Sequence, residues 1–409
     1  MACIVVVGGD GFCGWPTSLH LAAKGHDVVI LDNLSRREID RELGTESLTP
    51  IASMNDRLSA WAESGGRPIT FEQVDVARDP EALADALARY RPETVIHFAE
   101  QRAAPYSMRS VKHKRYTVDN NVSGTHNLLS AVVELGLDPH IVHLGTMGVY
   151  GYDSSGLTIP EGYLDILVPG EHNVVHKRQI LYPTNPGSVY HMTKSMDQLL
   201  FQFYARNDRV RVTDLHQGIV WGTQTEETRR DERLINRFDY DGDYGTVLNR
   251  FLMQAAVGHP LTVHGTGGQT RAFIHLQDTV GCIALAVENP PERNGRVMIR
   301  NQMTETHRIR DLAELVSGLT GVEVAMVDNP RNEAAENGLE VSNKSFLDLG
   351  LNPTTLENGL MDETVEIAQR FAHRSRTDAV PAMVTWTRDR NPGVLPADAA
   401  PSLGIATVA

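Results

Sequence analysis

Short apolar runs alternate with longer amphipathic stretches through the first half of the chain. The apolar runs have the length of buried strands, and the stretches between them have the length and period of helices. The predicted strands are residues 4–7, 28–31, 69–74, 94–98, 141–144 and 210–215. The main predicted helices are residues 12–24, 51–62, 80–90, 117–135 and 190–206. Strands and helices that alternate in this way predict an α/β fold with a doubly wound parallel sheet.

A turn rich in glycine follows the first predicted strand. Gly8, Gly11 and Gly14 stand three residues apart, and Asp32 closes the next strand. In a dinucleotide site the first glycine allows the turn, the second lets the backbone approach a pyrophosphate, and the third lets helix and strand pack closely. The helix N-terminus offers its N–H groups to the phosphates. The pattern predicts a Rossmann-type site for a dinucleotide; the alternative is a turn that binds nothing.

The ends of the other strands bear on the same cofactor. Asp32 would accept hydrogen bonds from the adenosine ribose and repel a 2′-phosphate, which favours NAD over NADP. Asp75 and Val76 would bind the adenine edge or simply end the third strand. The loop after the fourth strand lies at the sheet edge where open α/β sheets bind ligands. The predicted NAD contacts are Gly8, Asp10, Gly11, Phe12, Cys13, Gly14, Asp32, Asn33, Arg36, Asp75, Val76, Phe98, Ala99, Tyr190 and Lys194.

Tyr190 and Lys194 are four residues apart at the start of a predicted helix, so their side chains share one face. A nearby cation lowers the pKa of a phenol because it stabilises the phenolate. Tyr190 is therefore a candidate acid or base for a sugar hydroxyl, and Lys194 would also hold the nicotinamide ribose. Thr146 follows the predicted strand 141–144 and completes the set. In a chain without a dinucleotide turn, this spacing is usually an exposed helix face.

Charge and cysteine content narrow the partners and the compartment. The 409-residue chain has a formal net charge of −14, so we expect neither nucleic acid nor an anionic membrane as a partner. Cys3, Cys13 and Cys282 lack metal-ligand spacing, which predicts a cytoplasmic, reducing location and no metal site. Cys13 is expected to pack within the glycine turn. No apolar run approaches the roughly 20 residues that span a bilayer, and we expect no signal peptide.

The chain changes character after residue 215. Strands are predicted at 261–264 and 322–327, and helices at 246–257 and 310–318. Residues 272–275 are expected to rejoin the main sheet. We therefore expect an NAD-binding domain over 1–215, with about 272–286 returning to it, a smaller substrate lobe over 216–376, and a tail over 377–409 that is either loose or wrapped on the surface. Upstream of Tyr190, residues 164–168 and 173–176 predict a hairpin near the site.

Long blocks of sequence carry a resemblance to a known family. With Thr146, Tyr190 and Lys194, the glycine turn resembles that of the extended short-chain dehydrogenases/reductases, which include nucleotide-sugar epimerases and dehydratases. Among them, the chain resembles the UDP-sulfoquinovose synthase family over about residues 3–390. The blocks are GGDGFCGW (8–15), ESLTPIAS (46–53), HFAEQR (97–102), APYSM (104–108), LGTMG (144–148), FDYD (238–241), GTVLNRF (245–251), GGQTR (267–271) and NPR (329–331).

The resemblance implies a chemistry and a set of residues for it. It implies C4 oxidation of UDP-glucose, elimination of water across C5 and C6, addition at C6 of a sulfur nucleophile derived from sulfite, and C4 reduction. By position, Thr146, Tyr190 and Lys194 would oxidise C4. His191 would move a proton at C5 or C6, unless it is a packed core histidine. The implied substrate contacts are Arg102, Thr146, Met147, Gln217, Thr246, Asn249, Gln269, Arg271 and Arg331.

Arg102 has two open interpretations. It would bind sulfite, or it would form a structural ion pair with an acid such as Glu100. We also expect a homodimer that takes a nucleotide sugar, UDP-glucose in the first place, together with sulfite.

Two positions depart from the family pattern. The family has a glutamate where this chain has Val149, beside Thr146, and residues 332–339 replace an acidic, tyrosine-containing stretch. The alternative function is therefore a nucleotide-sugar 4-epimerase or dehydratase without sulfur chemistry. Met147 and Gly148 stand where 4,6-dehydratases have acids, which favours the epimerase. A third alternative is a catalytically silent NAD-sensing protein on this fold. The presence of Thr146, Tyr190 and Lys194 together argues against it, because such a protein would not need them.

Overall fold

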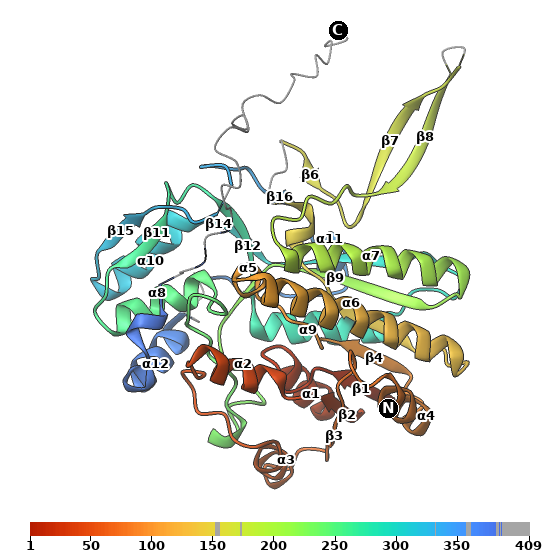
Figure 1. The fold of residues 1–409 in the computed structure, drawn as a ribbon, viewed down its shortest axis with the longest axis horizontal. Helices are drawn as coiled ribbons and strands as arrows, with labels where there is room; N and C mark the ends of the chain where they lie inside the picture. The colour runs from red at the N-terminus through yellow and green to blue at the C-terminus, as the bar shows by residue number, and fades with distance from the viewer. Residues whose placement is uncertain are drawn as a thin grey trace.

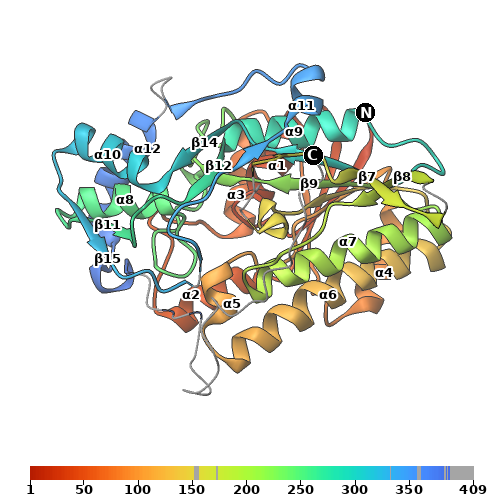
Figure 2. The ribbon, with the colours of Figure 1, turned by 90° about the horizontal axis from the view of Figure 1, so that it is seen from above.

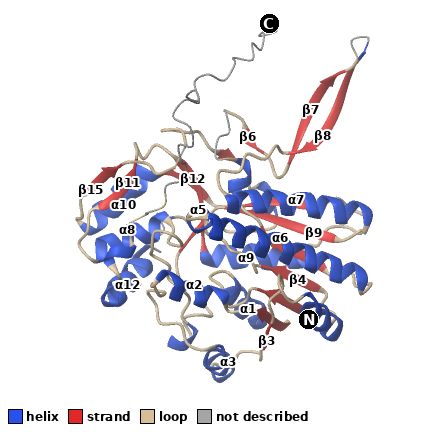
Figure 3. Cartoon of the chain, in the orientation of Figure 1, coloured by secondary structure: helices blue, strands red, loops and turns tan. Residues whose placement is uncertain are grey.

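A seven-stranded parallel sheet forms the centre of the larger lobe (Figures 1 and 3). The computed structural model describes residues 1–151, 156–171, 174–331, 333–356, 361–381, 384 and 386, without the side chains of 361–363. The strand order is β13-β9-β5-β4-β1-β2-β3, and all neighbouring pairs are parallel. The strands are β1 (Cys3–Val7), β2 (Asp27–Asp32), β3 (Thr70–Gln73), β4 (Thr94–His97), β5 (His140–Leu144), β9 (Arg211–Gln217) and β13 (Met298–Gln302). The predicted doubly wound sheet is confirmed.

Helices cover both faces of this sheet (Figure 2). Alternate residues of a strand point to opposite faces, so Ile4 and Val6 of β1 pack in one core and Val5 and Val7 in another. The first core includes α1 (Gly14–Ala23) and α9 (Leu276–Glu288). The second core includes α4 (Pro80–Tyr90), α6 (Val111–Glu134) and α7 (Val189–Asn207). The apolar runs therefore predicted the strands because each strand is buried on both sides.

The insertion after β2 contains two helices, α2 (Ser35–Leu43) and α3 (Met54–Glu63). The sequence predicted only the second of them. Helix α2 lacks an apolar period because its inward side chains are charged and form ion pairs, among them Arg37 with Asp10 at 2.6 Å. Helix α5 (Ala104–Met108) follows the loop after β4.

The smaller lobe has its own sheets and core. Strands β10 (Ile219–Trp221), β12 (Thr270–His275) and β14 (Glu305–Arg308) form one sheet, and β11 (Leu261–His264) pairs with β15 (Val324–Val327). Its helices are α8 (Val247–Ala256), α10 (Ile309–Thr320) and α12 (Met361–Phe371). The expectation that 272–275 rejoins the main sheet is wrong, since β12 pairs with β10 and β14, and β13 takes the seventh place. Helix α9, which follows β12, does pack on the main sheet. The domain limits themselves stay a prediction.

A β-hairpin stands out from the body of the molecule (Figure 1). Its strands are β7 (Tyr163–Pro169) and β8 (Val175–Leu181), paired in antiparallel register from Tyr163 with Leu181 to Pro169 with Val175. The hairpin was predicted, and its residue 173 lies outside the described residues. The remaining short elements are β6 (Thr158–Ile159), β16 (Glu340–Val341) and α11 (Lys344–Asp348). In the part of the chain that the structure describes, no helix combines the length and the apolar character needed to cross a membrane.

Candidate active site

One cavity of about 350 Å³ lies at the carboxyl ends of the main-sheet strands and is bounded on its far side by the smaller lobe. It brings together nearly all the residues that the sequence predicts for a site. Those that line it are Gly8, Asp10, Gly11, Phe12, Cys13, Gly14, Asp32, Asn33, Arg36, Val76, Phe98, Ala99, Arg102, Thr146, Met147, Tyr190, His191, Lys194, Gln217, Thr246, Gln269, Arg271 and Arg331. Asp75 and Asn249 do not line it.

The three glycines of the turn have distinct surroundings. Gly8 has a φ of +87°, and a Cβ there would lie 2.6 Å from the backbone nitrogen of Ala99. A Cβ on Gly14 would overlap the carbonyl oxygen of Gly8, whereas a Cβ on Gly11 would meet only that oxygen at 3.3 Å. Gly8 thus allows the tight turn, and Gly14 allows the helix to pack closely on the strand. Gly11 leaves the backbone accessible from the cavity. This cradle fits the pyrophosphate of NAD.

Asp32 is held at the end of β2 by the backbone of its neighbours. Its carboxylate accepts hydrogen bonds from the backbone N–H groups of Asp10 at 2.9 Å and Leu34 at 2.7 Å. Burial, and then Asp10, raise the pKa of Asp32 to about 6, so the carboxylate is ionised at neutral pH. An ionised acceptor at this place suits the hydroxyls of an NAD ribose.

Arginines from the insertion brace the glycine turn. The carboxylate of Asp10 pairs with Arg37 at 2.6 Å and with the fully buried Arg57 at 2.7 Å. The side chain of Asp10 therefore ties the turn to α2 and α3. Arg37 and Arg57 therefore hold the glycine turn in place through Asp10, and the role of Arg57 could not be recognised from the sequence.

Asp75 holds a turn. Its carboxylate accepts hydrogen bonds from Nδ2 of Asn33 at 3.0 Å and from the backbone N–H groups of Ala77 at 3.1 Å and Arg78 at 3.0 Å. Val76, its neighbour, lines the cavity. Of the two interpretations of Asp75, the contacts of its side chain support the strand terminus.

Cys13 is a buried thiol. Burial raises its pKa to about 11, so the sulfur stays protonated at neutral pH. This agrees with the packing role expected within the turn.

Thr146, Tyr190 and Lys194 converge from the end of β5 and from α7. Ser188 caps α7, where its hydroxyl accepts a hydrogen bond from the backbone N–H of His191 at 3.1 Å. In the first turn, the backbone N–H of Tyr190 donates to the hydroxyl of Ser107 at 3.2 Å. Thr146 follows β5 and accepts a hydrogen bond from the backbone N–H of Gly148 at 3.1 Å. Together with Lys194, one turn further along α7, these side chains line one wall of the cavity.

Lys194 is anchored by three contacts. Its Nζ atom donates to the carbonyl oxygen of Leu144 at 2.6 Å, lies 2.8 Å from Oε2 of Glu100, and lies 3.0 Å from Nε2 of His143. Burial acts to lower the pKa of Lys194, but Glu100 and then Tyr190 outweigh it and raise the pKa. The ammonium is therefore charged.

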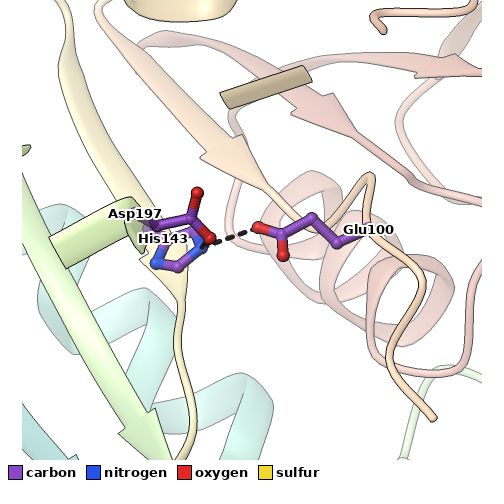
Figure 4. A group of neighbouring side chains, drawn as sticks. All are labelled: Glu100, His143 and Asp197. Carbon is purple, nitrogen blue, oxygen red and sulfur yellow. Dashed lines mark hydrogen bonds and ion pairs between the residues drawn. The ribbon is translucent and has the colours of Figure 1, made fainter. Parts of the chain in front are cut away.

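A cluster of metal-ligand residue types adjoins Lys194 (Figure 4). Among the described residues, donor atoms of Glu100, His143 and Asp197 all lie within 4.8 Å of one another. The ammonium of Lys194 already lies against Glu100 and His143, so this cluster holds a side-chain cation.

Comparisons with known proteins agree with this geometry. Residues 4–299 match the model of the NAD dependent epimerase/dehydratase family. The chain is 44% identical over 391 residues to the chloroplastic UDP-sulfoquinovose synthase of Spinacia oleracea, covering 94% of this chain and 79% of that protein. It is 40% identical over 357 residues to the UDP-sulfoquinovose synthase of Sulfolobus acidocaldarius, covering 86% of this chain and 88% of that protein. The chain belongs to the UDP-sulfoquinovose synthase family.

Solved structures confirm the fold. The NAD complex of UDP-glucose 4-epimerase from Brucella ovis superposes with a TM-score of 0.66 at 24% identity, covering 91% of this chain and 99% of that one. At this identity the likeness speaks for the Rossmann-type architecture alone. Its family membership and the glycine cradle make this UDP-sulfoquinovose synthase family member an NAD-dependent enzyme.

Val149, the departure from the UDP-sulfoquinovose synthase pattern, does not face the cavity. It is buried in a small core with Tyr150, Ile159 and Leu339, and it is absent from the cavity wall. The change therefore alters packing behind Thr146 and leaves the chemical groups on the wall in place.

His191 lies in the wall next to Tyr190. Its ring packs against Gly148, where a Cβ would overlap it. Burial, and then Arg331 and Arg271, lower the pKa of His191 to about 3, so the imidazole is neutral at physiological pH. The packed-core alternative is incomplete, because this buried ring also lines the cavity.

The acid beside Arg102 is Asp239. The Arg102 guanidinium forms an ion pair with Asp239, which also lies 3.0 Å from Arg36. Glu100 pairs with Lys194 instead. Arg36, which was predicted to contact NAD, stacks on the ring of Tyr244 at 3.7 Å from the ring centroid.

The far end of the cavity is basic and includes residues that sequence reasoning missed. Arg250 of α8 lines the wall beside Arg271 of β12 and Arg331. Asn249 is buried behind this wall, where its Nδ2 atom donates to the carbonyl oxygen of Asp239 at 3.4 Å. Arg250 lies in the family block 245–251, which was the one available signal for it.

The C-terminal segment also reaches the cavity. Val384 and Trp386 line it, and the guanidinium of Arg331 lies 4.6 Å from the ring centroid of Trp386. The backbone N–H of Trp386 donates to the carbonyl oxygen of Pro330 at 3.0 Å. A wholly loose tail is wrong for these two residues. The β7–β8 hairpin, expected near the site, contributes none of its described residues to the wall.

Proposed function

We propose that this enzyme makes UDP-sulfoquinovose from UDP-glucose and sulfite. The observation that carries the proposal is its 44% identity, over 94% of the chain, to a UDP-sulfoquinovose synthase, joined to one cavity that holds both the glycine cradle and the C4 oxidation set. The net reaction exchanges the C6 hydroxyl of the sugar for a sulfonate, and water leaves. Oxidation and reduction at C4 cancel, so the cofactor ends each turnover in its starting state.

Tyr190 is the proposed acid and base at C4. It takes the proton of the C4 hydroxyl during oxidation and returns it during reduction, while Thr146 orients the sugar oxygen by a hydrogen bond. The charge of Lys194, one helical turn away, stabilises the phenolate. NAD, when bound, supplies the hydride acceptor for C4 and returns the hydride at the end.

His191 is the proposed proton carrier at C5 and C6. Elimination of water needs a base for the proton on C5 and an acid for the leaving hydroxyl. His191 lies in the cavity wall next to Tyr190, and its imidazole is neutral, so a ring nitrogen has a lone pair for the proton; the same low pKa makes it a weak base until a bound anion offsets Arg331 and Arg271. Three acids of the wall fit this role less well, since Asp239 pairs with arginines, Glu333 pairs with Arg271, and Glu100 pairs with Lys194.

The anionic parts of the substrates are assigned to arginines. Arg250, Arg271 and Arg331 surround the far end of the cavity and suit the diphosphate, because guanidinium groups match phosphate geometry. Arg102 is our candidate for sulfite. It pairs with Asp239, and its remaining N–H groups are donors for an oxyanion.

The test is incubation of the purified protein with UDP-glucose, with and without sulfite, followed by mass spectrometry and chromatography of the nucleotide sugars. A sulfonated nucleotide sugar that forms only with sulfite supports the proposal. The second candidate, a 4-epimerase without sulfur chemistry, needs only Thr146, Tyr190 and Lys194 of the cavity wall, and the family glutamate is absent at Val149, behind that wall. UDP-galactose formed without sulfite, and no sulfonated product with it, would establish that candidate.

We also infer a homodimer built on α7. Met192, Met196, Leu199 and Phe203 recur at helical spacing on one exposed face of this helix. Leu199 and Phe203 are 65% and 53% exposed, and such a stripe suits burial against a second copy.

We infer a reducing compartment, the cytoplasm in the first place. The support is that Cys3, Cys13 and Cys282 are all free, and the last two are buried.

A further inference from the structure

The carboxylate of Glu100 lies between two cationic side chains. Its Oε2 atom is 2.8 Å from Nζ of Lys194, and its Oε1 atom is 2.8 Å from Nε2 of His143. Glu100 comes from the loop after β4, Lys194 from α7 and His143 from β5, so three separate elements meet at this carboxylate. Figure 4 shows the contact between Glu100 and His143. The side chains of all three are nearly inaccessible to solvent. Their charges are therefore little screened by water.

The contacts continue from His143 into the interior. Nδ1 of His143 lies 2.8 Å from Oδ1 of Asp214, and Oδ2 of Asp214 lies 3.0 Å from Nε2 of His216. Nδ1 of His216 lies 2.6 Å from the hydroxyl of Tyr150. From the cavity inward, the order of charge is thus positive at Lys194, negative at Glu100, positive at His143 and negative at Asp214.

Three other side chains lie close to His143. Asp197 of α7 lies 3.8 Å from Nε2 of His143, and burial, followed by Glu100, raises the pKa of Asp197 well above its usual range. Burial lowers the pKa of His97, on β4, to about 3. The ring of Phe201 on α7 packs on His143 with ring centroids 4.8 Å apart.

His143 itself carries the second positive charge. Burial and Lys194 act to lower its pKa, but Asp214 and Glu100 outweigh them and raise it to about 9. Burial acts to raise the pKa of Glu100, but Lys194 and His143 outweigh it and hold the pKa low. The Lys194 ammonium and the His143 ring lie 3.0 Å apart, and the carboxylate of Glu100 contacts both of them.

We propose that Glu100 and His143 are positioning residues for the C4 oxidation, an inference that rests on the proposed function. Glu100 fixes the Lys194 ammonium one helical turn from Tyr190, and the charge of His143 keeps Glu100 from cancelling that of Lys194. Neither residue needs to touch the sugar. They act through the electric field at the Tyr190 hydroxyl, which sets how easily the phenolate forms. The positive charge of His143 favours the phenolate, and the negative charge of Glu100 disfavours it.

The opposite signs give the test. His143→Gln removes a positive charge, which destabilises the phenolate, so the acid limb of the pH profile for NADH formation should move to higher pH. Glu100→Gln removes a negative charge that contacts the Lys194 ammonium and should move that limb to lower pH, each by roughly one pH unit. The rate is measured on mixing enzyme with UDP-glucose and no sulfite. His143→Lys restores the positive charge and should restore the wild-type profile.

A matched control lies on the same strand. His140 is also buried on β5, but its Nε2 atom contacts the neutral hydroxyl of Thr213 at 2.8 Å. His140→Gln should leave the profile unchanged. Shifts of both test variants in one direction, a shift in only one of them, or an equal shift in His140→Gln would each overturn the proposal.

A second readout does not depend on turnover. NMR of the ligand-free protein labelled with ¹⁵N-histidine reports the charge of His143, whose signals are identified by their loss in His143→Gln or His143→Lys. We expect an imidazolium at neutral pH, and a neutral ring would overturn the proposal. A wild-type enzyme that forms no NADH with UDP-glucose counts against the proposed function instead, and the NMR result then decides this inference.

Discussion

The phenol of Tyr190 is the group on which every proposed step depends. Tyr190→Phe removes one hydroxyl and keeps the ring that packs beside His191, with ring centroids 5.3 Å apart. Because C4 oxidation precedes the later steps, NADH formation and the sulfonated product should fall together. The loss of acid–base catalysis is expected to cost about 10²–10⁴ in rate. Rapid mixing with absorbance detection of NADH measures the first quantity, and mass spectrometry the second.

The neighbouring histidine provides the contrast. His191→Ala should keep NADH formation but stop the sulfonated product, because its role comes after C4 oxidation. Calorimetric titration with UDP-glucose checks that both variants still bind the sugar. Near wild-type turnover in Tyr190→Phe, or loss of NADH formation in His191→Ala with the sugar still bound, would contradict this division of labour.

His140 gives a prediction for stability against pH. Burial lowers its folded-state pKa to about 3, whereas an unfolded histidine titrates near 6.5. Between these values the unfolded chain binds the extra proton, so the stability that comes from a neutral His140 is lost as pH falls below about 6.5. The free energy of unfolding of the wild type, relative to His140→Gln, should fall by roughly 2 kcal/mol between about pH 7.5 and pH 5. Urea unfolding at the two pH values measures this, and a constant difference would show that His140 is not held neutral.

At the scale of elements, α7 has two different faces. One turns Tyr190, His191 and Lys194 to the cavity, and the other exposes the stripe from Met192 to Phe203. The double substitution Leu199→Glu and Phe203→Glu places two charges where a second copy would cover them, and burying unpaired charge is costly. Light scattering should find a dimer for the wild type and a monomer for the variant, with unchanged circular dichroism.

A control for this substitution exists elsewhere on the surface. Leu319 of α10 is 56% exposed in the smaller lobe, so Leu319→Glu makes a similar change away from α7. It should leave the mass unchanged. A wild-type monomer, or a dimer that survives the double substitution, would contradict the assignment of the stripe.

The main sheet could be predicted from sequence because most of its strands are continuous apolar runs. Strand β13 was missed because its sequence is polar: Arg300, Asn301 and Gln302 are buried, and the amide nitrogens of the last two donate to backbone carbonyl groups. Nδ2 of Asn301 donates to the carbonyl oxygen of Ser342 at 2.8 Å, and Nε2 of Gln302 to that of Thr279 at 3.0 Å. The run 272–275 was recognised as a strand, but a local pattern does not say which sheet a strand joins.

The site was predictable to a similar extent. The glycine turn, Asp32 and the pair on α7 show themselves by spacing within one stretch of chain. Arg250 and Trp386 cannot be recognised by spacing, because only the folding of the chain brings them to the cavity. The same holds for His143, whose importance lies in its contact with Glu100, a residue 43 positions away.

At the scale of the whole molecule, the cavity draws on both ends of the chain. Trp386→Ala removes a ring that packs on Arg331 at the basic end of the cavity. If the nucleotide lies there, loss of this aromatic surface should raise the KM for UDP-glucose roughly tenfold and leave kcat unchanged, since stacking contacts are worth about 1 kcal/mol or more. Steady-state kinetics measures both constants. NAD affinity should not change, and a fall in kcat with KM unchanged would contradict the assignment.

The position of the cavity residues along the chain also determines the order in which the parts of the cavity are synthesised. A ribosome releases the glycine turn and Asp32 before Trp386, which lies several hundred residues further along the chain. The wall that receives the nucleotide sugar cannot be finished until translation has passed that residue, long after the dinucleotide cradle has left the exit tunnel. A message cut short after α12 would therefore yield a chain with the cradle and the C4 set but with an open substrate end. Such a product would compete for cofactor in the cell without making sugar sulfonate.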